Sequence, residues 1–423
     1  MAEVKAFKAL RFTGKAGDPA KNLCPPYDII SPSEREALIS ESENNLVRLE
    51  LPQGENAYRE AAILLDKWLS DGVVAEDKHD GIYIYEEEFT ALGQRKRIKG
   101  IVALVKIEEF SKGVILPHED TLSKAKQDRF NLMKACGCNF SQIYSMFIDP
   151  DKKISGKVNE LSKGAPDEQA VTDDGIIHRL WISTDDEANA YISRAFADKQ
   201  LFIADGHHRY ETSLNYRNYL REQGLAKEGD KSDYVMMFLI DIDDEGLVIF
   251  PTHRMIRDLS SFNEESVIER SRDFFEIERV EGTGDIDRRL LELTDSKSYA
   301  FYTGRDYYYI LTLKKDVSLD SIAPERSQAY RDLDVTALHS LILERVMGID
   351  KENMANGVNL TYTRSLDEAV EKVQDGSFQC SFILNPTKIH QIKDVAAAGD
   401  RMPQKSTYFY PKLITGMVMN KIR

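Results

Sequence analysis

The chain has 423 residues, of which 42% are hydrophobic and 30% charged, and its net charge is -15. This length allows two or three packed subdomains, and no apolar stretch is long enough to predict a membrane span or a secretory signal. The acidic balance argues against a nucleic-acid partner, because such affinity comes mainly from basic groups that neutralise phosphates. Four cysteines in so long a chain predict no disulfide framework, so we expect a cytoplasmic protein.

The N-terminal third is expected to contain helices and a pair of strands. CPPYDIISPSEREAL combines prolines that favour extended backbone with a helix start at Ser31-Pro32. AAILLDKWLSDG has the spacing of an amphipathic helix that ends at Gly72. Residues 81–89 and 99–107 predict paired strands, and residues 121–135 follow a helical pattern.

The rest of the chain mixes strands and helices. In the middle third we expect a helix from about Tyr210 and strands at 178–183, 201–205, 233–243 and 246–256. In the last third we expect strands at 298–304 and 307–313 and helices near 334–347 and 365–374. This order predicts an α/β (α+β) protein with mixed sheets and helices, divided into segments 1–110, 111–260 and 261–423.

The stretch LFIADGHHRYE places ionisable side chains on a strand-to-helix turn. Asp205 would close a buried strand, at the edge where α/β folds open their ligand crevice, and Gly206 would let the backbone approach a ligand. His207, His208 and Arg209 would lie near the helix N-terminus, where N–H groups and the helix dipole attract anions. An anion site beside a carboxylate that holds a metal or takes a proton has the outline of a phosphoryl-transfer site.

Two other interpretations of this turn stay open. Asp205 could be only a helix cap, with the histidines as surface donors. His207 and His208 could also serve a metal hydrolase, although adjacent residues point apart on a strand or a helix.

Further candidate residues follow other predicted strands. His118, Glu119 and Asp120 form an ionisable run that suits a general base or Mg²⁺ ligation, although such a run is also common as a solvated cap. Asp128 and Arg129 lie on the helix that follows. The dipeptide His253-Arg254 places two donors at another strand end.

Two short motifs fall short of known sites. GDRMPQKST nearly matches a phosphate-binding loop, but Gln404 stands where that loop has its second glycine, and the preceding residues predict a helix. Lys405, Ser406 and Thr407 could still contact an anion. Cys136 and Cys138 lie two apart without a second pair that would complete a zinc site, so we predict that they bind no metal.

Several motifs together resemble one family over residues 20–418. CPPYDIIS, HEDT followed by DR, ADGHHRYETS, PTHR and MPQKSTYFYPK resemble the domain-of-unknown-function 1015 family. That family is similar to the ParB and sulfiredoxin superfamily, which implies a ParB-like core extended by N- and C-terminal segments. The superfamily resemblance also implies that a glycine and basic residues before a helix hold nucleotide phosphates.

The free serine kinase branch of that superfamily has the same Asp-Gly-His-His-Arg turn. The resemblance implies catalytic roles for Asp205, also as a ligand of Mg²⁺, and for Glu119. It implies phosphate contacts by Gly206, His207, His208 and Arg209, and we expect Lys405, Ser406 and Thr407 to add further phosphate contacts. We also expect substrate contacts by His118, Tyr27, Asp28, Arg129, His253 and Arg254. The added PPYD and MPQKST segments leave ADP, ATP and pyrophosphate open as phosphoryl donors.

We therefore predict phosphoryl transfer to the hydroxyl of a small amino acid, with L-serine giving O-phospho-L-serine. Asp205 or Glu119 would take the hydroxyl proton, and Mg²⁺ would bridge the phosphates. The expected partners are the amino acid and the phosphate donor, without membrane or nucleic acid, and a homo-oligomer is compatible with the sequence. The alternatives are a phosphohydrolase or nucleotidase that uses water, and a non-catalytic nucleotide-binding ParB-like module.

Overall fold

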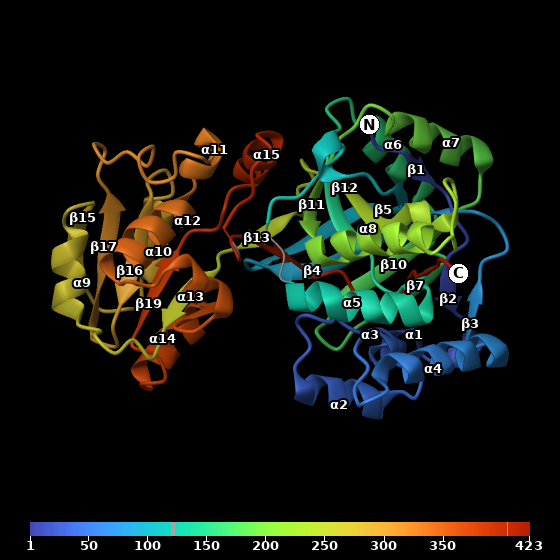
Figure 1. Cartoon of the computed structure of the whole chain (residues 1–423), viewed down its shortest axis with the longest axis horizontal. Helices are drawn as coiled ribbons and strands as arrows, with labels where there is room; N and C mark the ends of the chain where they lie inside the picture. The colour runs from blue at the N-terminus through green and yellow to red at the C-terminus, as the bar shows by residue number, and fades with distance from the viewer. Residues whose placement is uncertain (120–122, 404) are drawn as a thin grey trace. The chain divides into compact units, whose positions relative to one another are not determined.

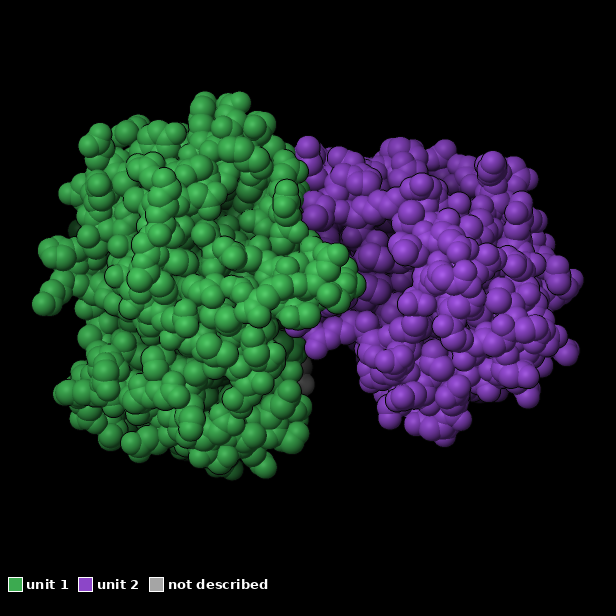
Figure 2. Space-filling view, turned by 180° about the vertical axis from the view of Figure 1, so that it is seen from behind, with its two compact units in different colours: residues 1–117, 121–248, 411–423 green, residues 118–120, 249–410 purple. Residues whose placement is uncertain are grey.

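The computed structural model describes residues 1–119, 123–403 and 405–423. They form two compact units, coloured separately in Figure 2. Unit 1 comprises residues 1–117, 121–248 and 411–423, and unit 2 comprises residues 118–120 and 249–410. The limits of these units differ from those of the three predicted segments. In particular, residues 411–423 belong to unit 1. No helix in the described part of the chain has the length and apolarity that crossing a lipid bilayer requires.

In the described part of unit 1, nine strands form one mixed sheet (Figure 1). They are β1 (Val4–Lys5), β4 (Ile82–Ala91), β5 (Gln94–Lys106), β6 (Ile115–Leu116), β8 (Ile143–Phe147), β9 (Glu168–Val171), β10 (Ile177–Ser183), β11 (Leu201–Asp205) and β12 (Tyr234–Asp241). The main order is β6-β11-β8-β12-β5-β4-β10-β9, and β1 pairs with β5. The β6–β11 and β8–β12 pairs are parallel, and the other pairs are antiparallel.

The predicted strand pair is the long hairpin β4–β5, which turns at Leu92 and Gly93, both with positive φ. Alternate residues of its strands enter one core cluster, as the period of two in a strand requires. That cluster also contains side chains of three helices, α6 (Lys153–Leu161), α7 (Asp186–Ala195) and α8 (His207–Glu222). The hydrophobic face of the sheet is therefore closed by helices.

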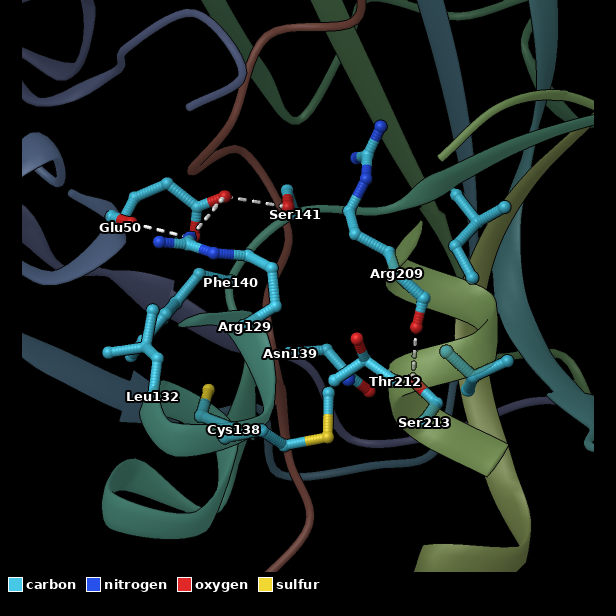
Figure 3. A pocket seen from close by; sticks show the side chains of 13 residues that line it. Glu50, Arg129, Leu132, Cys138, Asn139, Phe140, Ser141, Arg209, Thr212 and Ser213 are labelled. Atoms are coloured by element: carbon cyan, nitrogen blue, oxygen red, sulfur yellow. Dashed lines mark hydrogen bonds and ion pairs between the residues drawn. The ribbon is translucent and has the colours of Figure 1, made fainter. Parts of the chain in front are cut away.

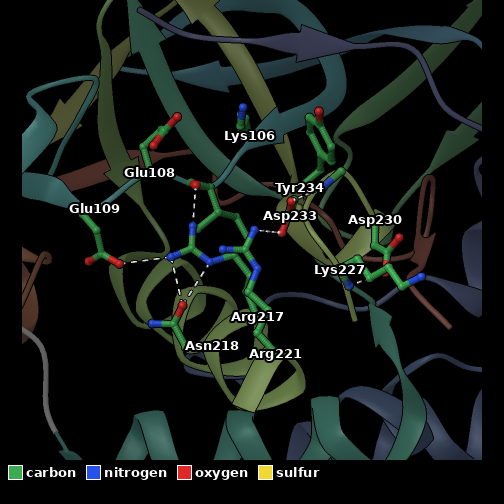
Figure 4. Close-up of polar contacts among 12 residues, drawn as sticks. Lys106, Glu108, Glu109, Arg217, Asn218, Arg221, Lys227, Asp230, Asp233 and Tyr234 are labelled. Atoms are coloured by element: carbon green, nitrogen blue, oxygen red, sulfur yellow. Dashed lines mark hydrogen bonds and ion pairs between the residues drawn. The ribbon is translucent and has the colours of Figure 1, made fainter. Parts of the chain in front are cut away.

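Helix α8 is fixed at its far end by polar contacts, which Figure 4 shows. Arg217 donates to the Ile107 carbonyl oxygen at 2.7 Å and to Glu109 at 3.0 Å. Arg221 pairs with the buried Asp233 at 2.6 Å. These contacts hold the helix whose first turn contains the candidate motif.

The other described helices of unit 1 lie outside the core cluster of the sheet, and all but the first of them contribute side chains to a second, smaller core. They are α1 (Pro19–Asn22), α2 (Pro32–Glu41), α3 (Val47–Glu50), α4 (Ala57–Asp71) and α5 (Ser123–Cys136). The predicted helix start at Ser31 is confirmed, because Ser31 and Glu34 form a reciprocal capping box. The predicted stop at Gly72 is confirmed as well, since Gly72 is a left-handed C-cap with φ 70°.

The C-terminal segment pairs with parts of unit 1 that lie far away in the sequence. Strand β21 (Asn420–Lys421) pairs with β7 (Cys138–Asn139), and β2 (Leu10–Phe12), which pairs with β3 (Val74–Glu76), also bridges to Met419. The backbones of Cys24 and Thr415 exchange two hydrogen bonds, of 2.8 and 3.2 Å. The last residues therefore complete unit 1.

In the described part of unit 2, six strands form an antiparallel sheet in the order β15-β17-β16-β19-β14-β18. They are β14 (His253–Ile256), β15 (Phe275–Glu281), β16 (Ser298–Tyr302), β17 (Tyr307–Leu313), β18 (Leu360–Thr363) and β19 (Cys380–Leu384). A separate pair joins β13 (Val248–Phe250) to β20 (Tyr408–Tyr410). Pro251 separates β13 from β14, so the predicted strand over 246–256 is two strands in different sheets.

The helices of unit 2 include one unusual element. They are α9 (Glu264–Ser271), α10 (Ile286–Glu292), α11 (Gln328–Arg331), α12 (Asp334–Ala337), α13 (Lys351–Asn356), α14 (Leu366–Gln374) and α15 (Ile389–Ala397). The predicted helix near 334–347 continues from α12 into a π-helix, η4 (Leu338–Val346). The elements of both units confirm the predicted α/β class with mixed sheets and helices.

Candidate functional site

The Asp-Gly-His-His-Arg turn joins β11 to α8, as predicted, but the helix begins at His207 rather than at Tyr210. Gly206 has φ 93°, a conformation that glycine adopts at little cost. A Cβ atom at this position would lie 2.9 Å from Nε of Arg209. Gly206 therefore serves both the turn and the close approach of the arginine.

Asp205 lies between two basic side chains. Its carboxylate accepts from Nη2 of Arg209 at 2.5 Å and forms an ion pair with Lys412. All three side chains are at most 16% exposed. Burial alone would raise the pKa of Asp205, but the Lys412 and Arg209 charges hold that pKa well below its usual range. Asp205 is thus ionised at neutral pH.

Arg209 is held by the protein on two sides of its guanidinium group. Nη1 donates to the Gln142 carbonyl oxygen at 2.5 Å, and Nη2 donates to Asp205. Gln142 also donates to the Ile414 carbonyl oxygen at 3.0 Å, so one residue connects Arg209 with the segment that contains Lys412. Of the two histidines in the turn, His207 is buried and His208 is half-buried.

A second polar group in unit 1 lies around Glu50 and includes Tyr27 and Arg129, two of the predicted substrate-binding residues; Figure 3 shows Glu50 and Arg129. Arg129 donates to the Glu50 carbonyl oxygen at 2.6 Å, and its guanidinium lies 4.0 Å from the Tyr27 ring centroid. Ser141 donates to the Glu50 carboxylate at 2.9 Å. Burial raises the pKa of Glu50, although the charge of Arg129 opposes the shift.

Charges of the turn act on the residues around Glu50. The charge of Arg209 lowers the pKa of both Glu50 and Tyr27, and the charge of Asp28 raises both. Glu50, Arg129 and Arg209 also line one cavity of about 40 Å³. A cavity of that size holds a few water molecules. Unit 1 thus brings Tyr27, Asp28 and Arg129 together with the turn.

The remaining predicted residues lie in unit 2, where several are engaged with one another. The buried His118 shares a 3.0 Å hydrogen bond with the Thr407 hydroxyl, which also donates to Glu119 at 3.2 Å. The buried Ser406 donates to the Pro403 carbonyl oxygen, and Lys405 has φ 55°. The predicted phosphate contacts of these three residues stay a prediction.

His253 and Arg254 lie in β14 and are both buried. Burial, helped by the charge of Arg254, lowers the pKa of His253 to about 3. Nη2 of Arg254 donates to the Lys405 carbonyl oxygen at 3.3 Å. The structure thus gathers the predicted residues of unit 2 in the same part of the fold, while Asp120 lies outside the described residues.

The sequence model of the family described as Protein of unknown function (DUF1015) matches residues 4–336, which is most of the chain. The chain belongs to this family. No curated protein shows significant sequence similarity to it.

Solved structures similar to this DUF1015 chain have low sequence identity. Free serine kinase in complex with AMP is 12% identical, covers 73% of this chain and 88% of its own, and has a TM-score of 0.36. A mutant of that kinase in complex with ADP is 11% identical, with 73% and 89% covered and a TM-score of 0.37. C-terminally truncated SbnI from Staphylococcus aureus is 12% identical, with 75% and 86% covered and a TM-score of 0.36.

Asp205 does not fit the Mg²⁺ ligation predicted for it. Asp205, the predicted ligand, already has two cationic partners, which would repel a third positive charge. Within residues 1–119, 123–403 and 405–423, no group of three His, Cys, Asp or Glu side chains has the arrangement of a metal site. Cys136 and Cys138 are buried, and burial raises the pKa of both thiols.

Sequence reasoning missed two residues, Glu50 and Lys412. Glu50 lies in VRLELPQG, where it looks like an ordinary helical surface residue. Lys412 directly follows the aromatic run YFYP, and only its long-range contact with Asp205 distinguishes it. The one available signal was that YFYPK belongs to a motif that resembles the family.

Proposed function

We propose that this DUF1015 protein is a small-molecule kinase that transfers a phosphoryl group to the hydroxyl of a free amino acid, with L-serine as the favoured acceptor. The donor is ADP, ATP or pyrophosphate. The observation that carries the proposal is the β11–α8 turn, where an ionised Asp205 lies between Arg209 and Lys412 at a helix N-terminus. The motif resemblance to free serine kinase supports the choice of acceptor.

The cations of the turn suit a phosphoryl group in transfer. Negative charge spreads over the phosphoryl oxygens in the transition state, and fixed cationic donors in a partly desolvated place stabilise that charge. Arg209 offers a planar fork, and Lys412 offers a compact ammonium group. In this proposal Asp205 holds both cationic side chains in position until a bound phosphate group pairs with them as well.

We propose a different base from Asp205. A general base works best when its pKa lies near the working pH, and the pKa of Asp205 is depressed. Burial raises the pKa of Glu50, which brings this carboxylate closer to the useful range. We therefore propose Glu50 as the base within unit 1, and Glu119 stays the alternative from the sequence.

The proposed step conserves atoms and charge. The serine Oγ forms a bond to the transferred phosphorus, and the bond between that phosphorus and the bridging oxygen of the donor breaks. The hydroxyl proton goes to the carboxylate of the base. The products are O-phospho-L-serine and the donor shortened by one phosphoryl group.

The test is incubation of the protein with ATP, ADP or pyrophosphate together with single amino acids, with mass spectrometry of the products. Phosphoserine that forms only with L-serine and one of these donors is the expected result. Release of phosphate without an acceptor would replace the proposal by a phosphohydrolase, and donor binding without turnover would replace it by a nucleotide-binding module. Glu50→Gln and Glu119→Gln, assayed side by side, identify the base.

A further inference from the structure

Unit 2 contains a cavity of about 170 Å³ that the proposed function does not use. A cavity of about 150 Å³ is enough for a six-membered ring, so this one suits a ligand of similar size. Its polar and charged lining residues are Glu325, Arg326, Tyr330, His339, Ser340, Glu344, Lys351 and Tyr362. They come from the segment before and within α11, from the π-helix η4, from α13 and from β18.

His339 presents a hydrogen-bond donor at this cavity. Nε of Arg254 donates to Nε2 of His339 at 3.2 Å, so Nε2 is the acceptor and the ring proton is on Nδ1. Burial, together with the charge of Arg254, lowers the pKa of His339 well below its usual range, so the ring stays neutral. Only 8% of the surface of His339 is exposed, yet its Nδ1 atom has no hydrogen-bond partner among the described residues.

Arg254, whose guanidinium donates to His339, has no carboxylate in direct contact among the described residues, although the charge of Glu119 acts on it. Arg254 is fully buried, and it forms no ion pair with any carboxylate of the described residues. Its guanidinium donates to the Thr252 and Lys405 carbonyl oxygens and lies 5.4 Å from the Tyr362 ring centroid. A buried charge is costly unless a partner compensates it, so this end of the cavity favours an anionic group.

The cavity also has an acidic side. Glu344 lies one helical turn beyond Ser340 in η4 and is half-buried. Burial raises its pKa, and Lys351 opposes that shift. A π-helix is rare and is frequently found at functional sites, and here it positions both His339 and Glu344 on the cavity.

We propose that this cavity of unit 2 binds a free α-amino acid as a zwitterion. The carboxylate accepts from Nδ1 of His339 in the field of Arg254, and the ammonium group donates to Glu344. Arg326 and Lys351 lie at the cavity lining as further cations for the carboxylate, and Arg326 itself pairs with Asp400 at 2.8 Å. This inference goes beyond the proposed function and does not depend on it.

The experiment is calorimetric titration of the full chain with L-serine, glycine and inorganic phosphate. L-serine and glycine are expected to bind, because both carry the two charged groups. Glu344→Gln and His339→Asn should each weaken L-serine binding at least tenfold. The matched controls are Glu352→Gln and His390→Asn, which change exposed residues of unit 2 outside the cavity lining and should leave the affinity unchanged.

Other results would overturn the assignment. Phosphate binding without amino-acid binding would show an anion site in place of a zwitterion site, and so would an unchanged affinity in Glu344→Gln. Asp205→Asn separates this inference from the proposed function, because it should abolish transfer and leave amino-acid binding at unit 2 intact. If folding of His339→Asn fails in circular dichroism, Glu344→Gln decides alone, since Glu344 is only half-buried.

Discussion

Two arginines, one in each unit, solve the problem of a buried positive charge in opposite ways. Arg209 in unit 1 pairs with Asp205, which also pairs with Lys412. Arg254 in unit 2 is surrounded by carbonyl oxygens, an aromatic ring and a neutral histidine. The first arginine is paired with a carboxylate, whereas the second has no such pair among the described residues, so we expect its charge to act on a ligand in the neighbouring cavity.

The difference teaches how a site can be prepared for an anion. A protein carboxylate keeps basic residues in position and can give up part of its contacts when a phosphate arrives. An uncompensated buried arginine instead attracts a ligand from the start, at a cost to the stability of the empty protein. Each arrangement predicts a distinct response to substitution.

The largest effect is expected for Asp205→Asn. The change leaves Arg209 and Lys412 without their counter-charge, which should lower the free energy of unfolding by about 3 kcal/mol. Phosphoryl transfer should fall at least about a hundredfold. Urea unfolding and the product assay measure the two effects.

A second variant sharpens this result. Asp205→Asn combined with Lys412→Met should recover stability, because one unpaired cation is removed, but it should not recover transfer. Wild-type activity in Asp205→Asn would reduce Asp205 to a structural partner of Arg209 and Lys412.

Arg209→Lys should have the next largest effect. Lysine cannot keep both the Asp205 and the Gln142 contacts, so donor binding should weaken by about 1–3 kcal/mol. Equilibrium titration with the donor measures the change. An unchanged donor affinity would contradict a phosphate role for this arginine.

The stability of unit 2 should depend on pH through His253. Its pKa is about 3 in the folded protein because of burial and the charge of Arg254, against about 6.5 when unfolded. Between these values the unfolded chain binds the extra proton, so stability is lost as the pH falls below 6.5. The contribution approaches about 1.4 kcal/mol per pH unit.

Urea unfolding between pH 7 and pH 4 measures this dependence, with His253→Asn as the comparison. That variant has no titrating ring and should show a shallower loss. An identical slope in both proteins would contradict the depressed pKa.

Arg254→Met should have the smallest effect on stability. Replacing an uncompensated buried charge by an apolar side chain of similar length is often close to neutral, so we expect a change below about 1 kcal/mol. Amino-acid binding by unit 2 should nevertheless be lost. A large loss of stability would place Arg254 among the structural residues of unit 2.

Much of the local structure was predictable from the sequence, because it depends on neighbouring residues. The β4–β5 hairpin follows from the hydrophobic pattern, and the stop of α4 follows from Gly72. The turn at Asp205-Gly206 was also predictable, although the helix begins earlier than its hydrophobic pattern indicated.

What depends on distant residues could not be predicted. Lys412 reaches Asp205 only because residues 411–423 pair with unit 1. The conversion of the helix near 334–347 into a π-helix has no counterpart in the hydrophobic spacing. The pairing of His339 with Arg254 joins a helix to a strand across 85 positions.

The return of the last residues to unit 1 has a consequence for synthesis of the protein. A chain that emerges from the ribosome N-terminus first presents Asp205 and Arg209 long before Lys412, because residues 249–410 must be made in between. At translation rates of about 5–20 residues per second, this delay is on the order of ten seconds. During this delay Asp205 has Arg209 but not Lys412 as a partner. Lys412 is present only in a nearly finished chain, so a fragment released by premature termination lacks a complete turn.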